Sequence, residues 1–415
     1  KTDDPLQYEL VSTNTSTNGE IIPNISKTDI TGTSIELGSG KFAKANNASH
    51  TYELKIYYPK KATSQNANQG ATFSAHVEIA SAKAPTVSTL AQTILAKNEV
   101  KAPITTPGAA ISTASEALLA STEDDYGTSY YFRGAVTNNY VEFANKCWRI
   151  VRVGGDGSVK LILHNDNTAK AANPCAAANN SSSAAFARYS GTTYTSAFNE
   201  KDDDNAYVGF KYGTAGSNTY EATHANTNKS TILTNLETWY TNNLKTYESV
   251  IDDNVWCNDK TKVTDTSYNP GSYGGNATGL GYGTNKTYYG ATQRLVSTNL
   301  SAGGTGPSLK CNGELSKINS KVGLITADEL ALAGYAYYIS NTTTYLQENA
   351  TAWWWSLSPH IFYGNYASVW YVRGGGGDFS VNNVSSACGV RPSISLKSTT
   401  NVTGDGTSDK PYKVV

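Results

Sequence analysis

Three features are missing or scarce in this chain of 415 residues. It contains no methionine and begins at Lys1, so residue 1 is not a translation start, and we expect the chain to derive from an exported precursor. Charged residues make up only 16% and leave a formal net charge of -1, which argues against a nucleic-acid partner because such proteins carry a basic face. No run of about 18 apolar residues occurs, so no membrane span is predicted.

Catalytic motifs are also missing from the sequence. It has no nucleophile elbow, HExxH pair or Walker loop, and its five histidines are scattered without the spacing of helical metal ligands. The acidic run 202–204 is expected to be a solvated loop, with a weak calcium site as the alternative. The residues therefore point to no cofactor and no metal site.

Five cysteines lie far apart in the chain, and none forms a CxxC pair. Thiolate zinc sites usually need such close spacing, so metal binding by cysteine is not predicted. In an exported chain, two disulfides and one leftover thiol are favoured. Proximity in the sequence favours Cys147–Cys175 and Cys257–Cys311, which leaves Cys388 free. Five buried, reduced cysteines are the alternative.

Tyrosine, glycine and small polar residues are abundant, as is typical of extracellular β-rich proteins. Within residues 1–81, the stretches 51–58 and 71–80 alternate apolar and polar residues with a period of two, which predicts half-buried strands. Residues 82–125 are rich in Ala, Thr, Pro and Ser, and they predict a linker that contains a short helix at 88–97. Residues 399–415 are predicted to form a C-terminal tail.

The main domain is expected at residues 126–398. Residues 145–164 predict a hairpin around a GGDG turn, since glycine supplies the positive φ that tight turns need. Residues 229–251 place their apolar side chains on one helical face. Residues 321–338 predict a strand followed by a helix, with Thr326 and Glu329 as its capping box. The predicted fold class is mainly β with some α: a β-sandwich-like N-terminal domain and an α+β domain.

Residues 353–396 carry the strongest functional signal in the sequence. They contain WWWSLSP at 353–359, then VRGG at 372–375, then GVRP at 389–392. In order and spacing these pieces resemble the C-terminal core of the C-type-lectin-like fold, in its formylglycine-generating-enzyme branch. Together with the preceding CWRIV, WCND and VGLITADEL, they look like surface proteins of gut Firmicutes and Mollicutes that end in GVRP-x-I-x-L. The resemblance covers residues 126–415.

This resemblance implies a binding domain without catalysis. Formylglycine-generating enzymes need paired thiols just after the RGG turn, whereas here Asp378, Phe379 and Ser380 follow and Cys388 stands alone. At least one ring of the tryptophan run is expected to face outward, and Arg391 is expected to pin a loop through its guanidinium group.

Structural roles are expected for Trp354, Arg373, Gly374 and Arg391. Aromatic, Asn and Ser side chains dominate adaptable binding surfaces. Ligand contacts are accordingly predicted at seven residues: Tyr363, Tyr366, Trp370, Tyr371, Asp378, Phe379 and Asn382.

The N-terminal stretch 51–80 is similar to the last two strands of the camelysin/TasA-type domain of exported biofilm-fibre proteins. Because the earlier strands of that domain are missing, the fragment is expected to expose a sheet edge. The start of the chain is a candidate for a strand donated to a neighbouring copy, with Leu6, Tyr8 and Leu10 pointing into the acceptor. The alternative is that upstream strands complete the sheet.

Together these patterns predict an exported, non-catalytic bacterial protein that is extracellular and lies at the cell surface. Its predicted work is adhesion, or recognition of a glycan or protein ligand, through the lectin-like domain. The alternative is a structural subunit of an extracellular filament, a homopolymer assembled by β-strand exchange in the N-terminal part.

Overall fold

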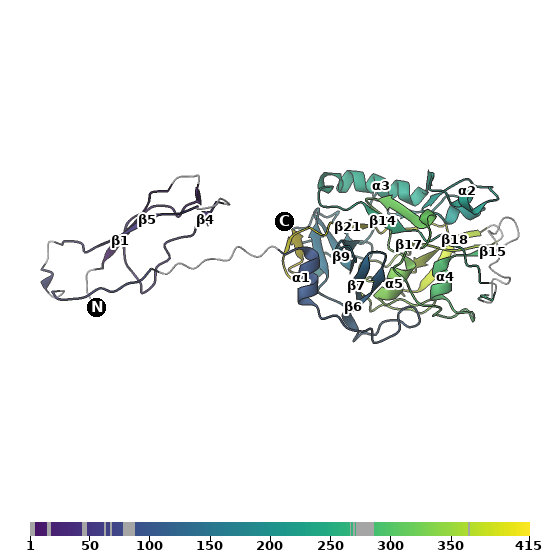
Figure 1. Cartoon of the computed structure of the whole chain (residues 1–415), viewed down its shortest axis with the longest axis horizontal. Helices are drawn as coiled ribbons and strands as arrows, with labels where there is room; N and C mark the ends of the chain where they lie inside the picture. Colours follow the sequence, from purple (N-terminus) through teal and green to yellow (C-terminus); the bar gives the residue numbers. More distant parts are fainter. Residues whose placement is uncertain are drawn as a thin grey trace. The chain divides into compact units, whose positions relative to one another are not determined.

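The computed structural model divides the chain into two compact units, Lys1–Ala82 (unit 1) and Lys83–Val415 (unit 2) (Figure 1). This boundary lies one residue from the one predicted from composition. The structure describes residues 5–14, 18–43, 48–61, 64–66, 69–77, 88–265, 267, 268, 270, 286–363 and 366–415.

Unit 1 is built on a three-stranded antiparallel sheet. Its central strand is β1 (Gln7–Ser12), which pairs with β3 (Ile25–Asp29) on one side and β5 (Tyr52–Tyr57) on the other. The short strands β2 (Gly19–Glu20) and β4 (Lys41–Phe42) pair separately. The strand predicted at 51–58 is therefore confirmed as β5.

Two other predictions for unit 1 are wrong. The start of the chain is not a free donor strand, because β1 is the centre of its own sheet and buries Tyr8 and Leu10 within its own chain. Residues 71–77 form no strand, and both Phe73 and Val77 are exposed. The remainder of the predicted strand, residues 78–80, lies outside the described residues. Alternation alone does not make a strand when no partner strand lies beside it.

Unit 2 contains two larger sheets. The first has eight strands in the order β21-β10-β9-β8-β23-β22, with β7 paired to β9 and β6 paired to β7. Its strands are β6 (Ala117–Asp124), β7 (Gly127–Gly134), β8 (Tyr140–Phe143), β9 (Lys146–Val153), β10 (Val159–Asn165), β21 (Ser393–Leu396), β22 (Val402–Thr403) and β23 (Tyr412–Val414). The predicted hairpin is confirmed as β9 and β10, and its turn includes Gly157 with φ of 80°.

The second sheet of unit 2 has six strands in the order β11-β20-β17-β18-β19, with β15 paired to β17. Its strands are β11 (Thr195–Ser196), β15 (Lys286–Tyr288), β17 (Trp354–Tyr363), β18 (Tyr366–Val372), β19 (Phe379–Asn383) and β20 (Cys388–Gly389). Two small pairs complete the strands: β12 (Lys211–Tyr212) with β13 (Asn228–Lys229), and β14 (Asn254–Cys257) with β16 (Lys317–Ser320). The mainly β class with some α is confirmed.

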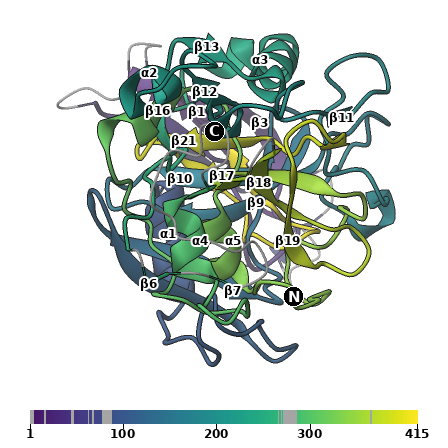
Figure 2. The same cartoon turned by 90° about the vertical axis from the view of Figure 1, so that its right-hand side faces the viewer.

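The predicted helices form close to where their sequence signals lie. They are α1 (Leu90–Lys97), α3 (Thr231–Asn243) and α5 (Ala327–Ala333), alongside two short ones, α2 (Tyr220–His224) and α4 (Gly290–Leu295). Thr326 and Glu329 form the expected capping box of α5. The predicted strand before α5 is absent, since residues 321–326 contribute only a single bridge from Gly323 to Ser393. Figure 2 shows α4 and α5 next to each other near the centre of the view, with α3 at the upper edge.

The predicted linker at 82–125 and tail at 399–415 are wrong where the structure describes them. Helix α1 buries Leu90 and Ile94, and β6 is a strand of the eight-stranded sheet. Strand β23, near the C-terminus, pairs with both β8 and β22. The small residues of these segments pack into the core, so a composition rich in Ala and Thr does not distinguish a linker from packed structure. Residues 82–87 lie outside the described residues.

Both predicted disulfides are present. Cys147–Cys175 joins β9 to the loop after β10, and Cys257–Cys311 joins β14 to the segment before β16. Cys388 is free and buried in β20, and burial raises the pKa of its thiol to about 12. Among the described residues, no helix is long and apolar enough to cross a membrane.

Candidate ligand-binding surface

Three of the seven predicted ligand contacts are buried. Trp370 and Phe379 have no exposed area, and Tyr371 is 2% exposed. Trp370 and Tyr371 are adjacent on β18 and so point to opposite faces of the sheet, yet both faces are covered. The prediction that these three side chains touch a ligand is therefore wrong, because β18 is covered on both faces and Phe379 is buried at the start of β19.

The other four predicted contacts occupy three places. Tyr363 and Tyr366 face each other at the β17–β18 hairpin and are 40% and 45% exposed, with the Lys286 ammonium 4.5 Å from the Tyr363 ring centre. Asn382 lies near the end of β19, where its side-chain oxygen accepts a hydrogen bond from the Asn383 amide at 3.0 Å. Asp378 lies beside the four-glycine run and accepts a hydrogen bond from the Ser340 hydroxyl.

One tryptophan faces outward, as predicted for the run 353–355. Trp353 is 50% exposed, whereas the other six tryptophans of the chain are fully buried. Trp353 lies just before β17, and its backbone oxygen accepts a hydrogen bond from the Gly389 amide at 2.5 Å. This anchored backbone fixes the point from which the ring projects into solvent.

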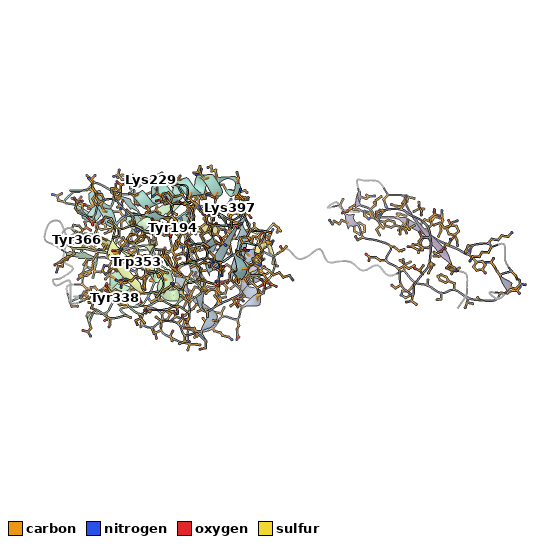
Figure 3. The ribbon with its side chains drawn as sticks, turned by 180° about the vertical axis from the view of Figure 1, so that it is seen from behind. Tyr194, Lys229, Tyr338, Trp353, Tyr366 and Lys397 are labelled. Carbon is orange, nitrogen blue, oxygen red and sulfur yellow. A yellow bond between two sulfur atoms is a disulfide. The ribbon has the colours of Figure 1, made fainter. Side chains whose placement is uncertain are left out.

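A second exposed ring, Tyr338, lies near Trp353 and comes from the turn after α5. It is 52% exposed and has a positive φ of 55°, which is unusual for a residue with a bulky side chain. Its amide donates a hydrogen bond to the Phe379 oxygen at 2.8 Å. The Arg373 guanidinium lies 5.9 Å from the centre of each ring. We call Tyr338, Trp353 and Arg373 the arginine-centred surface; both rings are labelled in Figure 3.

Buried aromatic side chains support both exposed rings. Under Tyr338, rings follow one another at centre distances of 4.5 Å to Tyr337, 5.5 Å from Tyr337 to Trp370 and 4.6 Å from Trp370 to Phe379. Aromatic pairs at such spacings contribute about 0.5–1.5 kcal/mol each beyond their buried area. The buried Trp370 and Phe379 thus support Tyr338 from below.

The same arrangement supports Trp353. Its ring lies 5.6 Å from the Tyr371 ring, which in turn lies 6.1 Å from Trp355. The Tyr371 hydroxyl accepts a hydrogen bond from Arg373 Nε at 2.7 Å, and this bond raises the pKa of Arg373 above its ordinary value. Tyr371 therefore orients Trp353 and Arg373 together.

The four-glycine run explains how the arginine-centred surface is held. A Cβ at Gly374 would lie 1.6 Å from the Thr351 backbone oxygen, and one at Gly377 would lie 2.2 Å from the Asn341 backbone oxygen. Gly377 also has a φ of 65°. The hairpin that carries Arg373 is thereby pressed against the segments that carry Trp353 and Tyr338. No larger residue fits at these two positions without moving the backbone.

Arg391 and Trp354 have the structural roles expected of them. Arg391 is fully buried, donates from Nε to the Leu163 oxygen at 2.9 Å and from Nη1 to the Leu346 oxygen, and lies 4.8 Å from the Trp354 ring centre. Burial lowers the pKa of Arg391 to about 10, so it stays charged at neutral pH. The bond to Leu346 confirms that this guanidinium pins a loop.

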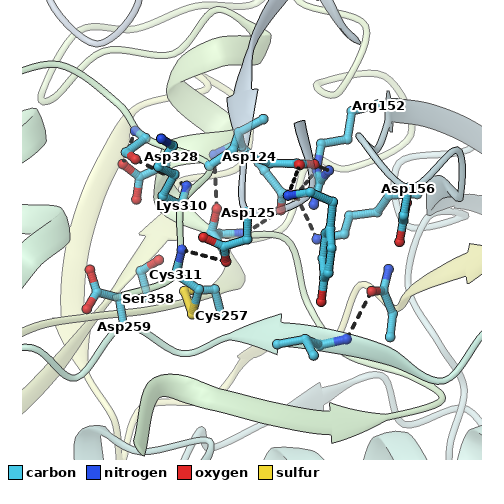
Figure 4. Close-up of a pocket in the computed structure, with 18 of the residues that line it drawn as sticks. Asp124, Asp125, Arg152, Asp156, Cys257, Asp259, Lys310, Cys311, Asp328 and Ser358 are labelled. Carbon is cyan, nitrogen blue, oxygen red and sulfur yellow. Dashed lines mark hydrogen bonds and ion pairs between the residues drawn. A yellow bond between two sulfur atoms is a disulfide. The ribbon is translucent and has the colours of Figure 1, made fainter. Parts of the chain in front are cut away.

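A charged pocket lies elsewhere in unit 2, beside the Cys257–Cys311 disulfide (Figure 4). Its free interior is about 40 Å³, which holds about three water molecules. Arg294 pairs with Asp328 at 2.6 Å and with Asp259 at 2.8 Å. The pocket is too small for an organic ligand, and these acids are already paired.

Glu329, a buried carboxylate that lines this pocket, belongs to the capping box of α5. It pairs with Lys160 at 2.7 Å and Arg152 at 2.9 Å, and Arg152 also pairs with Asp124 at 2.9 Å. Burial opposes ionisation of Glu329, but the two cations outweigh it and lower its pKa to about 2. The network ties β9 and β10 to α5, which is a structural role.

Three histidines are also buried in unit 2. Burial lowers the pKa of His224 and of His360 to about 3, and that of His164 well below its ordinary value. All three are neutral at pH 7. The described residues contain no group of three or more His, Cys, Asp or Glu that could hold a metal ion.

Sequence reasoning missed Tyr338 and did not identify which tryptophan is exposed. Tyr338 lies in AGYAYY, where Tyr335 and Tyr337 are buried and Tyr338 is not. Its positive φ reverses the direction in which the side chain points, and no residue type in that stretch signals this. The exposed Trp353 is the first of three identical residues, and only the start of β17 at Trp354 separates it from the buried pair.

Comparison with known families gives one match. Residues 295–398 match the model of DUF6273, which is described as a domain of unknown function. This range includes all three residues of the arginine-centred surface. No curated protein and no solved structure matches the chain.

Proposed function

We propose that this chain is an exported, non-catalytic surface protein that recognises a glycan ligand through the arginine-centred surface. The observation that carries the proposal is the exposure of Trp353 and Tyr338, both with ring centres 5.9 Å from the Arg373 guanidinium and each on a buried aromatic support. Large aromatic rings are normally removed from water, and aromatic and arginine side chains are enriched where proteins bind partners.

The chemistry of the surface suits a sugar. A pyranose ring has faces of C–H groups that pack on the face of an aromatic ring, where the π electrons carry partial negative charge. Its hydroxyl groups require donors and acceptors beside that ring. Arg373 supplies donors and the Asp378 carboxylate supplies an acceptor. A rigid support lowers the entropy that binding costs, because the rings are already placed.

The remaining features agree with a surface protein. The chain has two disulfides. Because disulfides form and persist in oxidising compartments, they support an extracellular location at the cell surface. The resemblance of residues 126–415 to lectin-like surface proteins supports adhesion or recognition as the role of unit 2.

Loss of glycan binding in a Trp353→Ala variant tests this proposal. Wild-type protein, Trp353→Ala and Tyr366→Ala are compared on an array of bacterial and host glycans, followed by calorimetry on the best binder. Truncation of a central contact costs about 2 kcal/mol or more, so Trp353→Ala should bind at least about 30-fold more weakly. Tyr366 is equally exposed but belongs to the hairpin tip, so its variant should bind as the wild type does.

The opposite pattern would contradict this assignment. If Tyr366→Ala loses binding while Trp353→Ala keeps it, the ligand lies at the β17–β18 hairpin. If no glycan binds the wild type, glycan recognition is wrong.

A second candidate function is filament assembly, which one feature of unit 1 favours. Within its described residues, β3 and β5 each pair with β1 alone, and Ile56 on β5 is 41% exposed. A strand from another copy would satisfy the outer backbone groups of either edge. Because β1 is already paired, the added strand has to come from another segment.

Electron microscopy of the full chain tests assembly. Fibres should appear as concentration rises, and Ile56→Lys should suppress them because a lysine on an edge strand disfavours strand addition. Ile104→Lys, at an exposed site of unit 2, is the matched control. A chain that sediments as a monomer at every concentration would exclude this function.

A further inference from the structure

We infer that the glycan bound by the arginine-centred surface is an acidic saccharide, whose carboxylate is held by the guanidinium group of Arg373. This inference rests on the proposed function and goes further, because it assigns the charge of the ligand and names the residue that binds the charged group. It derives from how Arg373 differs from the other arginines of the chain.

The chain has seven arginines, and six of them use at least one terminal nitrogen inside the protein. Arg133, Arg188 and Arg391 donate to backbone oxygens, and Arg149, Arg152 and Arg294 pair with carboxylates. Arg373 donates only from Nε, to the Tyr371 hydroxyl. Across the described residues, neither of its terminal nitrogens makes a hydrogen bond or an ion pair.

The free end of Arg373 is nevertheless held in place. The bond from Nε to Tyr371 fixes one edge of the guanidinium plane, and the centres of the Tyr338 and Trp353 rings each lie 5.9 Å from the guanidinium carbon. The two terminal nitrogens form the planar fork that matches a carboxylate in a bidentate pair. Because the arginine is already oriented, forming that pair costs less side-chain entropy than it would for a mobile surface arginine.

The surroundings leave the positive charge available. Asp378, the acidic residue of the same hairpin, accepts a hydrogen bond from Ser340 and forms no ion pair with Arg373, although its charge is a minor cause of the raised pKa of that arginine. The Tyr371 hydroxyl raises the affinity of Arg373 for its proton but does not neutralise it. A ligand carboxylate would therefore supply the direct ion pair that Arg373 lacks among the described residues.

The two rings favour a saccharide over an acidic peptide. A carboxylate on a peptide would use the arginine alone and leave Trp353 and Tyr338 in water. In an acidic saccharide, the carboxylate is attached directly to a pyranose ring, and neighbouring sugar rings continue on either side. Those rings would cover the aromatic faces while the carboxylate reaches the arginine beside them.

Matched acidic and neutral ligands test the inference. The probes are oligosaccharides of galacturonate, glucuronate and sialic acid, each paired with its methyl ester, in which the sugar rings stay the same and the negative charge is removed. A peptide of four glutamates is included. Binding to the full chain is measured by calorimetry at low and at high salt, for the wild type, Arg373→Gln, Trp353→Ala and Lys286→Gln. Lys286 lies at the Tyr363 hairpin and controls for the loss of one positive charge.

We expect at least one acid to bind about tenfold or more tightly than its ester, since hydrogen bonds between charged groups are stronger than those between neutral groups. Arg373→Gln should remove this preference and leave ester binding within about twofold, while Lys286→Gln keeps it. Trp353→Ala should weaken acid and ester alike. High salt should weaken the acid more than the ester, because exposed charges are screened.

Other outcomes separate the two claims. If acids and esters bind equally and Trp353→Ala abolishes both, the acidic ligand is wrong and glycan recognition stands. If Arg373→Gln still binds the acids more tightly than their esters, another residue binds the carboxylate and the inference fails. Binding of the glutamate peptide in place of every saccharide would overturn both claims.

Discussion

The replacement of one glycine by alanine tests how the arginine-centred surface is built. In Gly374→Ala the added Cβ would lie 1.6 Å from the Thr351 oxygen and 2.1 Å from its carbonyl carbon. Both atoms belong to the backbone, so neither can rotate away. To return to the 3.0 Å that real Cβ contacts keep, the hairpin has to shift by about 1.4 Å relative to that segment. Overpacking of this kind costs about 1–3 kcal/mol.

Gly376→Ala provides a control with the same chemical change in the same loop. There the nearest atoms to the new Cβ are 3.7 Å away and belong to the Asp378 and Ser340 side chains, which is ordinary contact. Its effect on the free energy of unfolding should stay within about 0.5 kcal/mol. Both variants reduce the freedom of the unfolded chain equally, so that contribution cancels in the comparison.

Urea unfolding followed by fluorescence measures the difference. We expect a lower midpoint for Gly374→Ala than for Gly376→Ala, together with weaker ligand binding, because Arg373 directly precedes the displaced residue. Equal stabilities and equal affinities for the two variants would refute the reasoning that the close approach to Thr351 positions Arg373.

Three further predictions concern unit 2. Trp354→Ala should lower the free energy of unfolding by about 3–5 kcal/mol, whereas Trp353→Ala should lower it by less than about 1 kcal/mol, because only Trp354 fills a buried site. Similar losses for the two variants in urea titrations would contradict this prediction. Because the Glu329 pKa is lowered to about 2, its stabilisation is complete above the ordinary value of 4.5 and is lost as pH falls towards 2. The free energy of unfolding of the wild type should therefore exceed that of Glu329→Gln by about 3 kcal/mol at pH 7 and by much less at pH 2. A difference that does not depend on pH would contradict the role given to the Glu329 charge. Replacing both Cys257 and Cys311 by serine should cost about 2–4 kcal/mol, and an unchanged melting temperature would disagree.

Local signals in the sequence predicted local structure well. The capping box of Thr326 and Glu329 and the glycine turn between β9 and β10 depend on residues a few positions apart, and both form. The disulfides also follow sequence proximity, since each cysteine bonds its nearest neighbour along the chain. Such features need little knowledge of the distant chain.

Features that depend on distant partners could not be predicted in this way. The composition of β6 predicts a linker, because its pairing with β7 and its burial against the rest of unit 2 leave no mark on that composition. Alternation predicts one exposed side for Trp370 and Tyr371, but β18 is covered on both sides. The exposed residues beside them, Trp353 and Tyr338, come from other segments that only the fold brings to Arg373.

Quenching of tryptophan fluorescence by acrylamide tests the ligand-binding role of the arginine-centred surface most directly. Trp353 is half exposed and the other six tryptophans are fully buried, so it accounts for the readily quenched emission. The wild type should show this component, Trp353→Phe should lack it, and the acidic oligosaccharide that binds most tightly should protect it from acrylamide. Calorimetry establishes whether that oligosaccharide binds. If it binds and acrylamide still quenches Trp353 as strongly as without the ligand, the ligand lies elsewhere and the assignment of this surface is wrong.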